Sequence, residues 1–269
     1  MFASLPPAQI VPRLLDEQDL YLASESTFYR ILRAAGEHKR RGRAAPPQRV
    51  GPPRRHQASA ANTVWSWDVT YLATRVRGQF LYLYLIVDIY SRKITGFEVF
   101  ESENATHSSR VIERAVWRQG IAHRPLVLHG DNGSAMKGAT LQARLEALGV
   151  TRSHSRPRVS NDNAFSEALF RTCKYRPGYP PNGFEDIDEA RQWVLAFVRW
   201  YNETHRHSAI RYVTPEQRHA GRDGAILAER ARLYQQAKQQ RPSRWSGATR
   251  DWSPVASVWL NPEPVLEAA

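Results

Sequence analysis

Residues 78–91, GQFLYLYLIVDIYS, form a segment that is apolar at almost every position. A strand with one face in water alternates apolar and polar residues, so a run that is apolar on both faces is typical of a strand buried inside a sheet. The preceding residues 64–74 alternate, with Trp67 on one face and Asp68 on the other. Residues 93–102 predict a third strand, and the short turn before them indicates antiparallel pairing.

The middle of the chain then alternates helices and strands. We expect, in order, a helix over 104–120, a strand over 125–133, a helix over 137–148, a strand over 150–154 and, further on, a helix over 186–204. Three antiparallel strands followed by alternating helices and strands are the element order of an RNase H-like domain. The prediction is therefore an α/β, RNase H-like fold with a mixed five-stranded sheet over residues 62–220.

The two ends of the chain differ from this middle part. Residues 1–37 predict two short helices, which fit either a DNA-reading helix-turn-helix or an ordinary helical hairpin. Residues 38–61 are basic and rich in proline, so they predict a solvated linker that can also lie along phosphates. Residues 221–269 form a basic tail with three tryptophans, which suits either a small module or a strand docked on the body.

Charge and cysteine content narrow the class of protein. The 38 Lys and Arg against 26 Asp and Glu give a net charge of +12, which favours nucleic acid as a partner, although a basic protein from an arginine-using genome would read the same way. The single cysteine, Cys173, excludes an intramolecular disulfide and a cysteine-rich metal site. No apolar run is long enough to cross a bilayer and the start lacks a signal-peptide pattern, so we expect a cytoplasmic protein.

Two aspartates lie where a sheet collects ligands. Asp68 is on the polar face of the first strand, and Asp131 comes just past the end of an apolar strand. If the two strands are neighbours, their carboxylates can converge. Carboxylate oxygens suit Mg²⁺ or Mn²⁺, and a pair of such ions can activate the attacking oxygen and stabilise the leaving oxygen in phosphodiester chemistry.

A helix over residues 161–174 carries two more acids. At about 100° per residue, Glu167, Arg171 and Lys174 fall within roughly 60° of arc, whereas Asp162 lies about 140° from Glu167. We therefore expect Glu167 to be a ligand and Asp162 to be a structural acid at the helix N-terminus. A Glu and a Lys seven residues apart are also common on a solvated helix face. The prediction therefore depends on the conjunction of strand Asp, strand-end Asp and helix Glu.

With these residues in place, the sequence resembles the DDE transposases of bacterial insertion sequences, which have a retroviral-integrase-like core. The matching segments, within residues 62–220, are WSWDVTYL, LYLIVDIYSRKITGF, LVLHGDNGS, SRPRVSNDNAFSEALFRTCKY and WYNETHRHSAIRYVTPEQ. The resemblance implies that Asp68, Asp131 and Glu167 are the catalytic residues and bind two Mg²⁺ or Mn²⁺ ions. The 35 residues between Asp131 and Glu167 match the family, and so does Lys174, seven residues after Glu167.

The resemblance also implies a reaction and partners. The expected enzyme is a polynucleotidyl transferase that cleaves the ends of the element in double-stranded DNA and joins the 3′ hydroxyls to a target by direct transesterification. It implies a homo-multimer in a synaptic complex at the nucleoid and, because the part before residue 60 is short, an upstream-frame DNA-binding protein. The residues expected to contact DNA are Lys174, Arg171, Arg156, Arg158, Asn161, Asn163 and Lys137.

Two alternatives remain at the level of sequence. A metal-dependent nuclease of the same fold would only hydrolyse DNA, and a non-catalytic regulator or inactive transposase remnant would only bind it. Two further residues have competing interpretations. Asp88 ends the second strand, where we favour a structural role, and His129 is either a substrate contact or a packed strand-end histidine.

Overall fold

The computed structural model describes residues 5–36, 52–131, 133, 138–156 and 160–262. It divides into two units, Met1–Val50 and Gly51–Ala269. In the described part of the chain, no helix is both long and apolar enough to cross a membrane.

The N-terminal unit contains two helices, α1 (Pro7–Gln18) and α2 (Glu25–Ala34). The Ser24 hydroxyl accepts a hydrogen bond from the backbone N–H of Thr27 and caps α2. The two helices match the prediction for this region. Their use as a DNA-reading helix-turn-helix stays a prediction.

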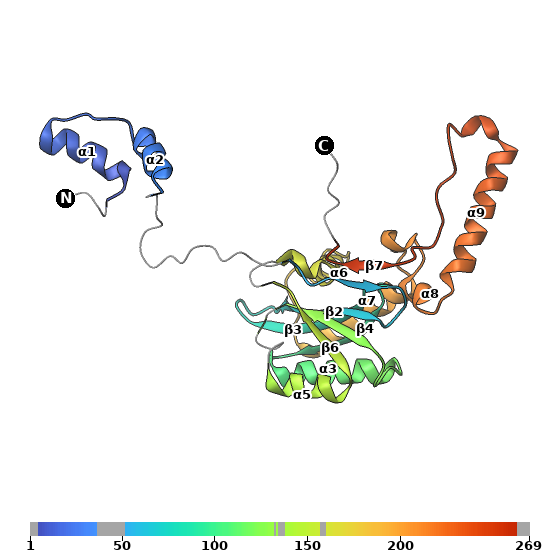
Figure 1. Ribbon diagram of the computed structural model, residues 1–269. Helices are drawn as coiled ribbons and strands as arrows, with labels where there is room; N and C mark the ends of the chain where they lie inside the picture. Colours follow the sequence, from blue (N-terminus) through green and yellow to red (C-terminus); the bar gives the residue numbers. More distant parts are fainter. Residues whose placement is uncertain (1–4, 37–51, 132, 134–137, 157–159, 263–269) are drawn as a thin grey trace. The chain divides into compact units, whose positions relative to one another are not determined.

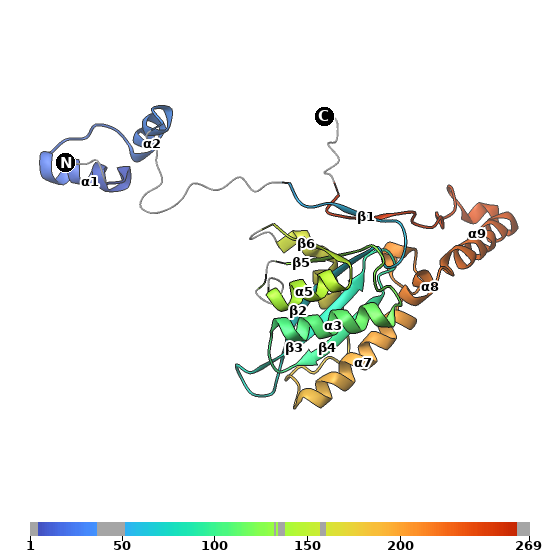
Figure 2. The same cartoon turned by 60° about the horizontal axis from the view of Figure 1, so that its bottom comes forward.

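The second unit is built on a mixed five-stranded sheet (Figure 2). Its strands are β2 (Val64–Ala73), β3 (Phe80–Asp88), β4 (Ile94–Phe100), β5 (Leu126–Gly130) and β6 (Val150–His154). The order across the sheet is β4-β3-β2-β5-β6; the first three are antiparallel, and β5 is parallel to both β2 and β6. This topology is that of an RNase H-like domain, so the predicted fold class is confirmed. The central strand β2 carries Asp68, and its parallel neighbour β5 leads to Asp131.

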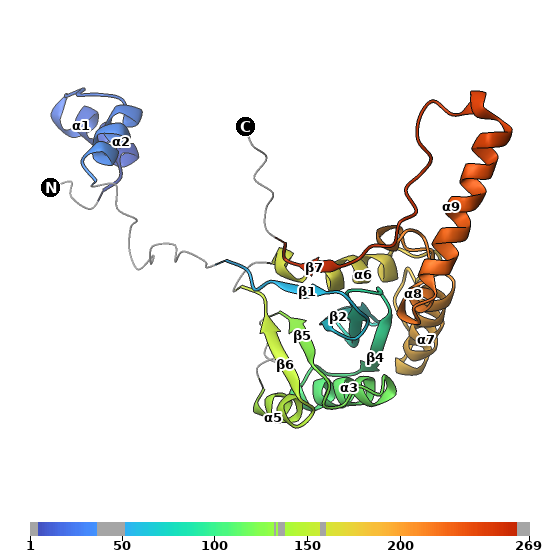
Figure 3. The same ribbon diagram turned by 45° about the vertical axis from the view of Figure 1, so that its right-hand side comes forward.

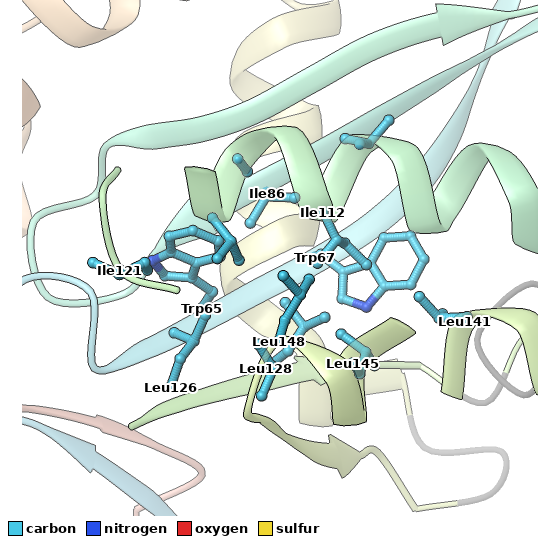
Figure 4. Packing of buried hydrophobic residues seen from close by; sticks show 14 of the residues in the cluster. Trp65, Trp67, Ile86, Ile112, Ile121, Leu126, Leu128, Leu141, Leu145 and Leu148 are labelled. Atoms are coloured by element: carbon cyan, nitrogen blue, oxygen red, sulfur yellow. The ribbon is translucent and has the colours of Figure 1, made fainter. Parts of the chain in front are cut away.

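Helices cover both faces of this sheet (Figure 1). On one face lie α3 (Ala105–Arg118) and α5 (Ala139–Ala147), and on the other lie α6 (Ala164–Lys174) and α7 (Ile187–Glu203). Trp65 and Trp67 of β2 are fully buried in the core beneath α3 and α5 (Figure 4). Because side chains alternate along a strand, the intervening β2 residues face α6. The polar side of β2 is therefore turned toward the helix that carries Glu167.

A two-stranded ribbon was not predicted. Residues His56–Ala58 form β1, which pairs antiparallel with β7 (Val258–Leu260). Ala58 and Leu260 are buried against Val64 and Ile89. The predicted linker 38–61 therefore extends too far, and the C-terminal segment contains the docked strand that was one of its two interpretations. A three-residue strand is too short to show a pattern in the sequence, and its partner lies about 200 residues away.

The region after α7 is more ordered than a tail. Short helices α8 (Pro215–His219), η2 (Ser208–Ile210) and η3 (Pro242–Arg244) accompany a long helix, α9 (Asp223–Gln240). The predicted boundary between the core and the C-terminal tail, at residue 221, falls just before α9. Arg218 and Asp223, on either side of this boundary, form a buried ion pair at 2.9 Å. Leu227 of α9 also packs against Ile210. The α9 helix therefore continues the fold of the second unit.

Candidate active site

Asp68 lies on the α6-facing side of the central strand and is half-buried. The pKa of its carboxyl is raised to about 7, first by burial, then by the charge of Asp131, and further by the charges of Glu167 and Glu103. A hydrogen bond from the backbone N–H of Val69 to Oδ1, at 2.8 Å, opposes this rise. The negative charges near Asp68 therefore come from three other acidic residues, each in a different part of the chain.

Asp131 is placed next to Asp68 by the pairing of their strands. Ser66 of β2 is opposite His129 of the parallel strand β5. Asp68 follows two residues later in β2, and Asp131 follows two residues later, just past the end of β5. The Asp131 side chain is exposed, and its Oδ1 accepts a hydrogen bond from the backbone N–H of Gly133 at 2.8 Å. The two strands are therefore neighbours, which was the condition for the carboxylates of Asp68 and Asp131 to converge.

The α6 helix brings a carboxylate and an ammonium to the same side of β2. Glu167 is exposed in its first turn, and its charge acts on Asp68. Lys174, in its last turn, donates from Nζ to the Thr70 hydroxyl at 2.8 Å, and burial lowers the pKa of its ammonium. Leu169 on the opposite side of the helix is buried in the core. This is the orientation that the helical phase predicts.

Asp162 is a structural acid, but it does not cap α6. Its buried carboxylate accepts hydrogen bonds from Nε and Nη2 of Arg156, both at 2.9 Å, and from the Arg156 backbone N–H at 2.8 Å. The side-chain hydrogen bond from Arg156 holds the pKa of Asp162 below its ordinary value. The guanidinium of Arg156, an expected DNA contact, is bound to Asp162, and its contact with DNA stays a prediction.

Asn163, another expected DNA contact, is buried. Its side chain is only 3% exposed. Nδ2 donates to the Trp67 carbonyl at 3.2 Å and to Oδ2 of Asp68 at 3.4 Å, and Oδ1 accepts from the Ser66 hydroxyl at 2.6 Å. A buried amide must be hydrogen-bonded internally. Asn163 therefore joins the start of α6 to Asp68 rather than facing solvent.

The remaining predicted contacts are less defined. Arg171 is exposed, with its guanidinium 5.9 Å from the centre of the Tyr175 ring. Lys137, Arg158 and the Asn161 side chain lie outside the described residues.

His129 and Asp88 have internal roles. His129 is fully buried, with Nε2 3.0 Å from the Asp162 carbonyl, so it is a packed strand-end histidine. Asp88 is buried and accepts hydrogen bonds from the backbone N–H groups of Asn62 and Ser91, both at 2.6 Å. The structural interpretation of Asp88 is therefore confirmed.

Glu103 was missed by sequence reasoning. It raises the pKa of Asp68, and its own pKa is raised by burial and by the charge of Asp131. It comes shortly after the end of β4 and immediately before Asn104, the N-cap of α3. Its position near a strand end, like that of Asp131, is the signal that could have drawn attention to it.

The donor chemistry fits a divalent ion, although the acids do not form a closed ligand cage. Among the described residues, no three His, Cys, Asp or Glu side chains are grouped closely enough to hold an ion. Asp68, Asp131 and Glu167 nevertheless supply carboxylate oxygens, the ligands of Mg²⁺ and Mn²⁺. The pKa of Asp68 is raised first by burial and then by the negative charge of its neighbours. A bound cation would relieve that repulsion, so the residues present fit such an ion.

Comparison with known proteins identifies the domain. Residues 58–160 match a family model described as "Integrase core domain", and residues 148–215 match a second model with the same description. Together the two matches cover more than half of the chain.

Curated relatives are insertion-sequence proteins. The transposase for IS904 from Lactococcus lactis is 33% identical over 168 residues, covering 60% of this chain and 62% of the relative. The putative transposase for IS986/IS6110 from Mycobacterium tuberculosis is 29% identical over 192 residues, covering 69% and 64%. The chain thus spans less than two thirds of the length of either relative.

Among solved structures, the HTLV-2 integrase catalytic core domain in complex with magnesium aligns with a TM-score of 0.45 and 17% identity. The alignment covers 60% of this chain and 97% of that one.

Proposed function

Because the chain belongs to the integrase core family and resembles insertion-sequence transposases, we propose that it is a DNA transposase. It would cleave the ends of its element and transfer the new 3′ hydroxyls to target DNA. The observation that supports this most is the placement of three acids around one strand. Asp68 is on β2, Asp131 follows the adjacent β5, Glu167 is on the covering helix α6, and the last two act electrostatically on the first.

Asp68, Asp131 and Glu167 would hold two Mg²⁺ or Mn²⁺ ions. When bound, such ions supply Lewis-acid activation of the attacking oxygen and stabilise the leaving oxygen of the phosphodiester. The chain's own residues prepare this site. Asn163 donates to Oδ2 of Asp68 and so orients it. Asp68, whose pKa is raised to about 7, would be a ligand in its deprotonated form.

Lys174 would bind a phosphate beside the acids. Its ammonium is held at Thr70, two residues along β2 from Asp68. An ammonium in that place attracts the DNA backbone without choosing a sequence. Arg171, exposed on the same helix, would extend the contact.

The wider assembly belongs to the same proposal. A homo-multimer that brings two element ends together and a cytoplasmic location at the nucleoid would suit a transposase acting on chromosomal DNA. An upstream-frame protein that adds end recognition is implied only by the resemblance to insertion-sequence transposases.

A joining assay tests the proposal. DNA flanking the coding frame would be searched for inverted repeats, and oligonucleotides ending at the repeat with a free 3′ hydroxyl would be incubated with plasmid and Mn²⁺. Joined product is the expected result, and Glu167→Gln and chelator controls should give none. Hydrolysis of the DNA without joining would identify the hydrolysing nuclease instead. Binding without any reaction would identify a regulator or an inactive remnant.

A further inference from the structure

The last part of the second unit forms a projecting arm. We call residues 223–252 the C-terminal arm. Both ends of the arm are anchored on the body: Leu227 near its start and Trp252 at its end are buried with Ile210. From there α9 leads away from the body, and the chain returns alongside it (Figure 3).

The arm is held together by its own contacts. The Tyr234 ring packs edge-on against Trp245 and Trp252, with centroids 5.9 and 5.4 Å apart. Lys238 Nζ donates to the Gly247 carbonyl at 2.8 Å, and the Gln235 amide donates to the Thr249 hydroxyl at 3.0 Å. The arm is therefore an ordered element with a defined surface.

The outer part of the arm carries charge of one sign. Residues 231–250 contain five Lys and Arg and no Asp or Glu. A single-sign surface of this kind is repelled by basic partners and attracted to polyanions. The charge of this part of the arm therefore favours a polyanion as partner, provided that its Lys and Arg side chains are not already bound within the protein.

Several basic residues of the arm are already engaged in holding it. Arg230 donates to the carbonyls of Arg211 and Tyr212 at 2.9 and 3.1 Å. Arg250 lies over the rings of Tyr212 and Trp252, 4.6 and 4.9 Å from their centres. These guanidinium groups serve the structure of the arm.

Arg232 is engaged in a different way. It pairs with Glu229 of the same helix at 2.7 Å, so its charge is matched locally.

Arg241 and Arg244 differ from these residues. Both are exposed, and neither side chain forms a hydrogen bond or ion pair with the part of the chain that the structure describes. They lie at the end of α9 and in η3, where they line a cavity of about 380 Å³ with Ala237, Gln240 and Trp245. Guanidinium forks match phosphate oxygens bidentately.

We propose that the tip of the C-terminal arm, formed by Arg241, Arg244 and Trp245, binds the phosphate backbone of duplex DNA. This deepens the proposed transposase function by adding a DNA contact on elements other than those that carry the acids. The contact is independent of sequence, because phosphates carry no base identity. Its effect is to hold DNA on the protein outside the catalytic site.

Salt dependence of DNA binding tests the proposal. The probe is a fluorescent random-sequence duplex, and its affinity for the full chain is measured by anisotropy from 50 to 200 mM salt. Each lost phosphate contact lowers the slope of log affinity against log salt by about 0.9. The double variant Arg241→Ala/Arg244→Ala should therefore have a slope smaller by about 2. Between 50 and 200 mM salt, the drop in DNA affinity should then be about tenfold smaller for the variant than for wild type.

A charge-matched control separates a local contact from bulk charge. Arg110→Ala/Arg118→Ala removes two exposed arginines from α3, which covers the opposite face of the sheet from α6. This variant should keep the wild-type slope. Equal slopes for the arm variant and wild type, or equal reductions in both variants, would overturn the proposal. Failure of wild type to bind any DNA would instead remove the proposed function itself.

Crosslinking covers the case in which the arm variant unfolds. Both arginines lie near the C-terminal end of α9, where positive charges interact favourably with the helix dipole and stabilise the helix. Replacing them can therefore weaken α9, so circular dichroism must accompany the binding data. A photoreactive residue at exposed Gln240 leaves both arginines intact. It should crosslink to the duplex at 50 mM salt and lose the crosslink to competitor DNA. Absence of any crosslink under conditions in which the protein binds the duplex would contradict the proposal.

Discussion

Asn163 connects the position of α6 to the orientation of Asp68. Its amide donates to Asp68 and to the Trp67 carbonyl, and it accepts from Ser66, so that one side chain joins helix and strand. Partners that orient a ligand in this way commonly change metal affinity or activity by about 10–100-fold when removed. Asn163 is a positioning residue in the proposed site.

We expect Asn163→Ala to lower strand transfer by about 10–100-fold while DNA binding is kept. The reason is that Asp68 loses the donor that orients Oδ2. A titration of strand transfer with Mn²⁺ should show half-saturation moved to higher metal, with partial rescue at saturation. Unchanged metal dependence in a folded variant would show that Asn163 only supports the fold.

Asp162 and Glu167, five residues apart, should respond differently to loss of charge. Glu167→Gln should abolish strand transfer with DNA binding intact. Asp162→Asn should instead lower the free energy of unfolding by roughly 1.5–3 kcal/mol, because Arg156 loses a charged hydrogen-bond partner. Urea unfolding at pH 7 measures the second effect and the joining assay the first. If Asp162→Asn abolished joining in fully folded protein, the assignment of the two acids would be wrong.

The same pair predicts a pH dependence. The pKa of Asp162 is lowered in the folded state, so its contribution is fully present above the unfolded value near 3.8 and is lost as pH falls through the lower folded value. In Asp162→Asn this acid-sensitive part should be missing below pH 4. Unfolding curves of wild type and variant should therefore converge as the pH is lowered.

At the scale of elements, the β1–β7 ribbon attaches the C-terminal segment to the domain. Leu260 is 1% exposed and packs with Ala58 and Ile89. The following Asn261 donates from its side chain to the Asp162 carbonyl at 3.3 Å, so the ribbon also reaches the segment before α6. The ribbon thus stabilises the body next to the proposed site.

We expect Leu260→Ala to lower the free energy of unfolding by about 2–5 kcal/mol, because it removes a buried side chain and leaves a cavity. Trp259 on the same strand is 46% exposed, and Trp259→Ala is the matched control, with a much smaller effect. Chemical denaturation of both variants measures the difference. Similar losses in the two would mean that the strand does not pack on the body as described.

At the scale of the whole molecule, the chain consists of two units, and the second holds all three proposed ligands. The helices α1 and α2 and the basic residues of 38–50 belong to the first unit. A DNA contact is one of the two interpretations of the helices, and the linker can also lie along phosphates. The three acids lie in the other unit.

A fragment of residues 51–269 should therefore unfold cooperatively with a midpoint close to that of the full chain. Its joining activity on ends with a free 3′ hydroxyl should persist at high protein concentration. Its affinity for DNA should fall by about tenfold or more at low salt, because several phosphate contacts are removed. Equal affinity in fragment and full chain would show that residues 1–50 do not contact DNA.

The sequence alone determined the elements of the core. Periodicity located each strand of the sheet and the helices α3, α5, α6 and α7, and helical phase distinguished Glu167 from Asp162. These inferences succeeded because the alternation of buried and exposed residues is a local property that neighbouring residues display.

Only the tertiary structure decided which side chains meet. Nothing in the sequence near Asn163 indicates that its amide binds Asp68, 95 residues away. The same is true of the pairing of β1 with β7, in which His56 is opposite Leu260. Such contacts depend on how the elements pack in space, and packing of distant segments leaves no periodic pattern in either one.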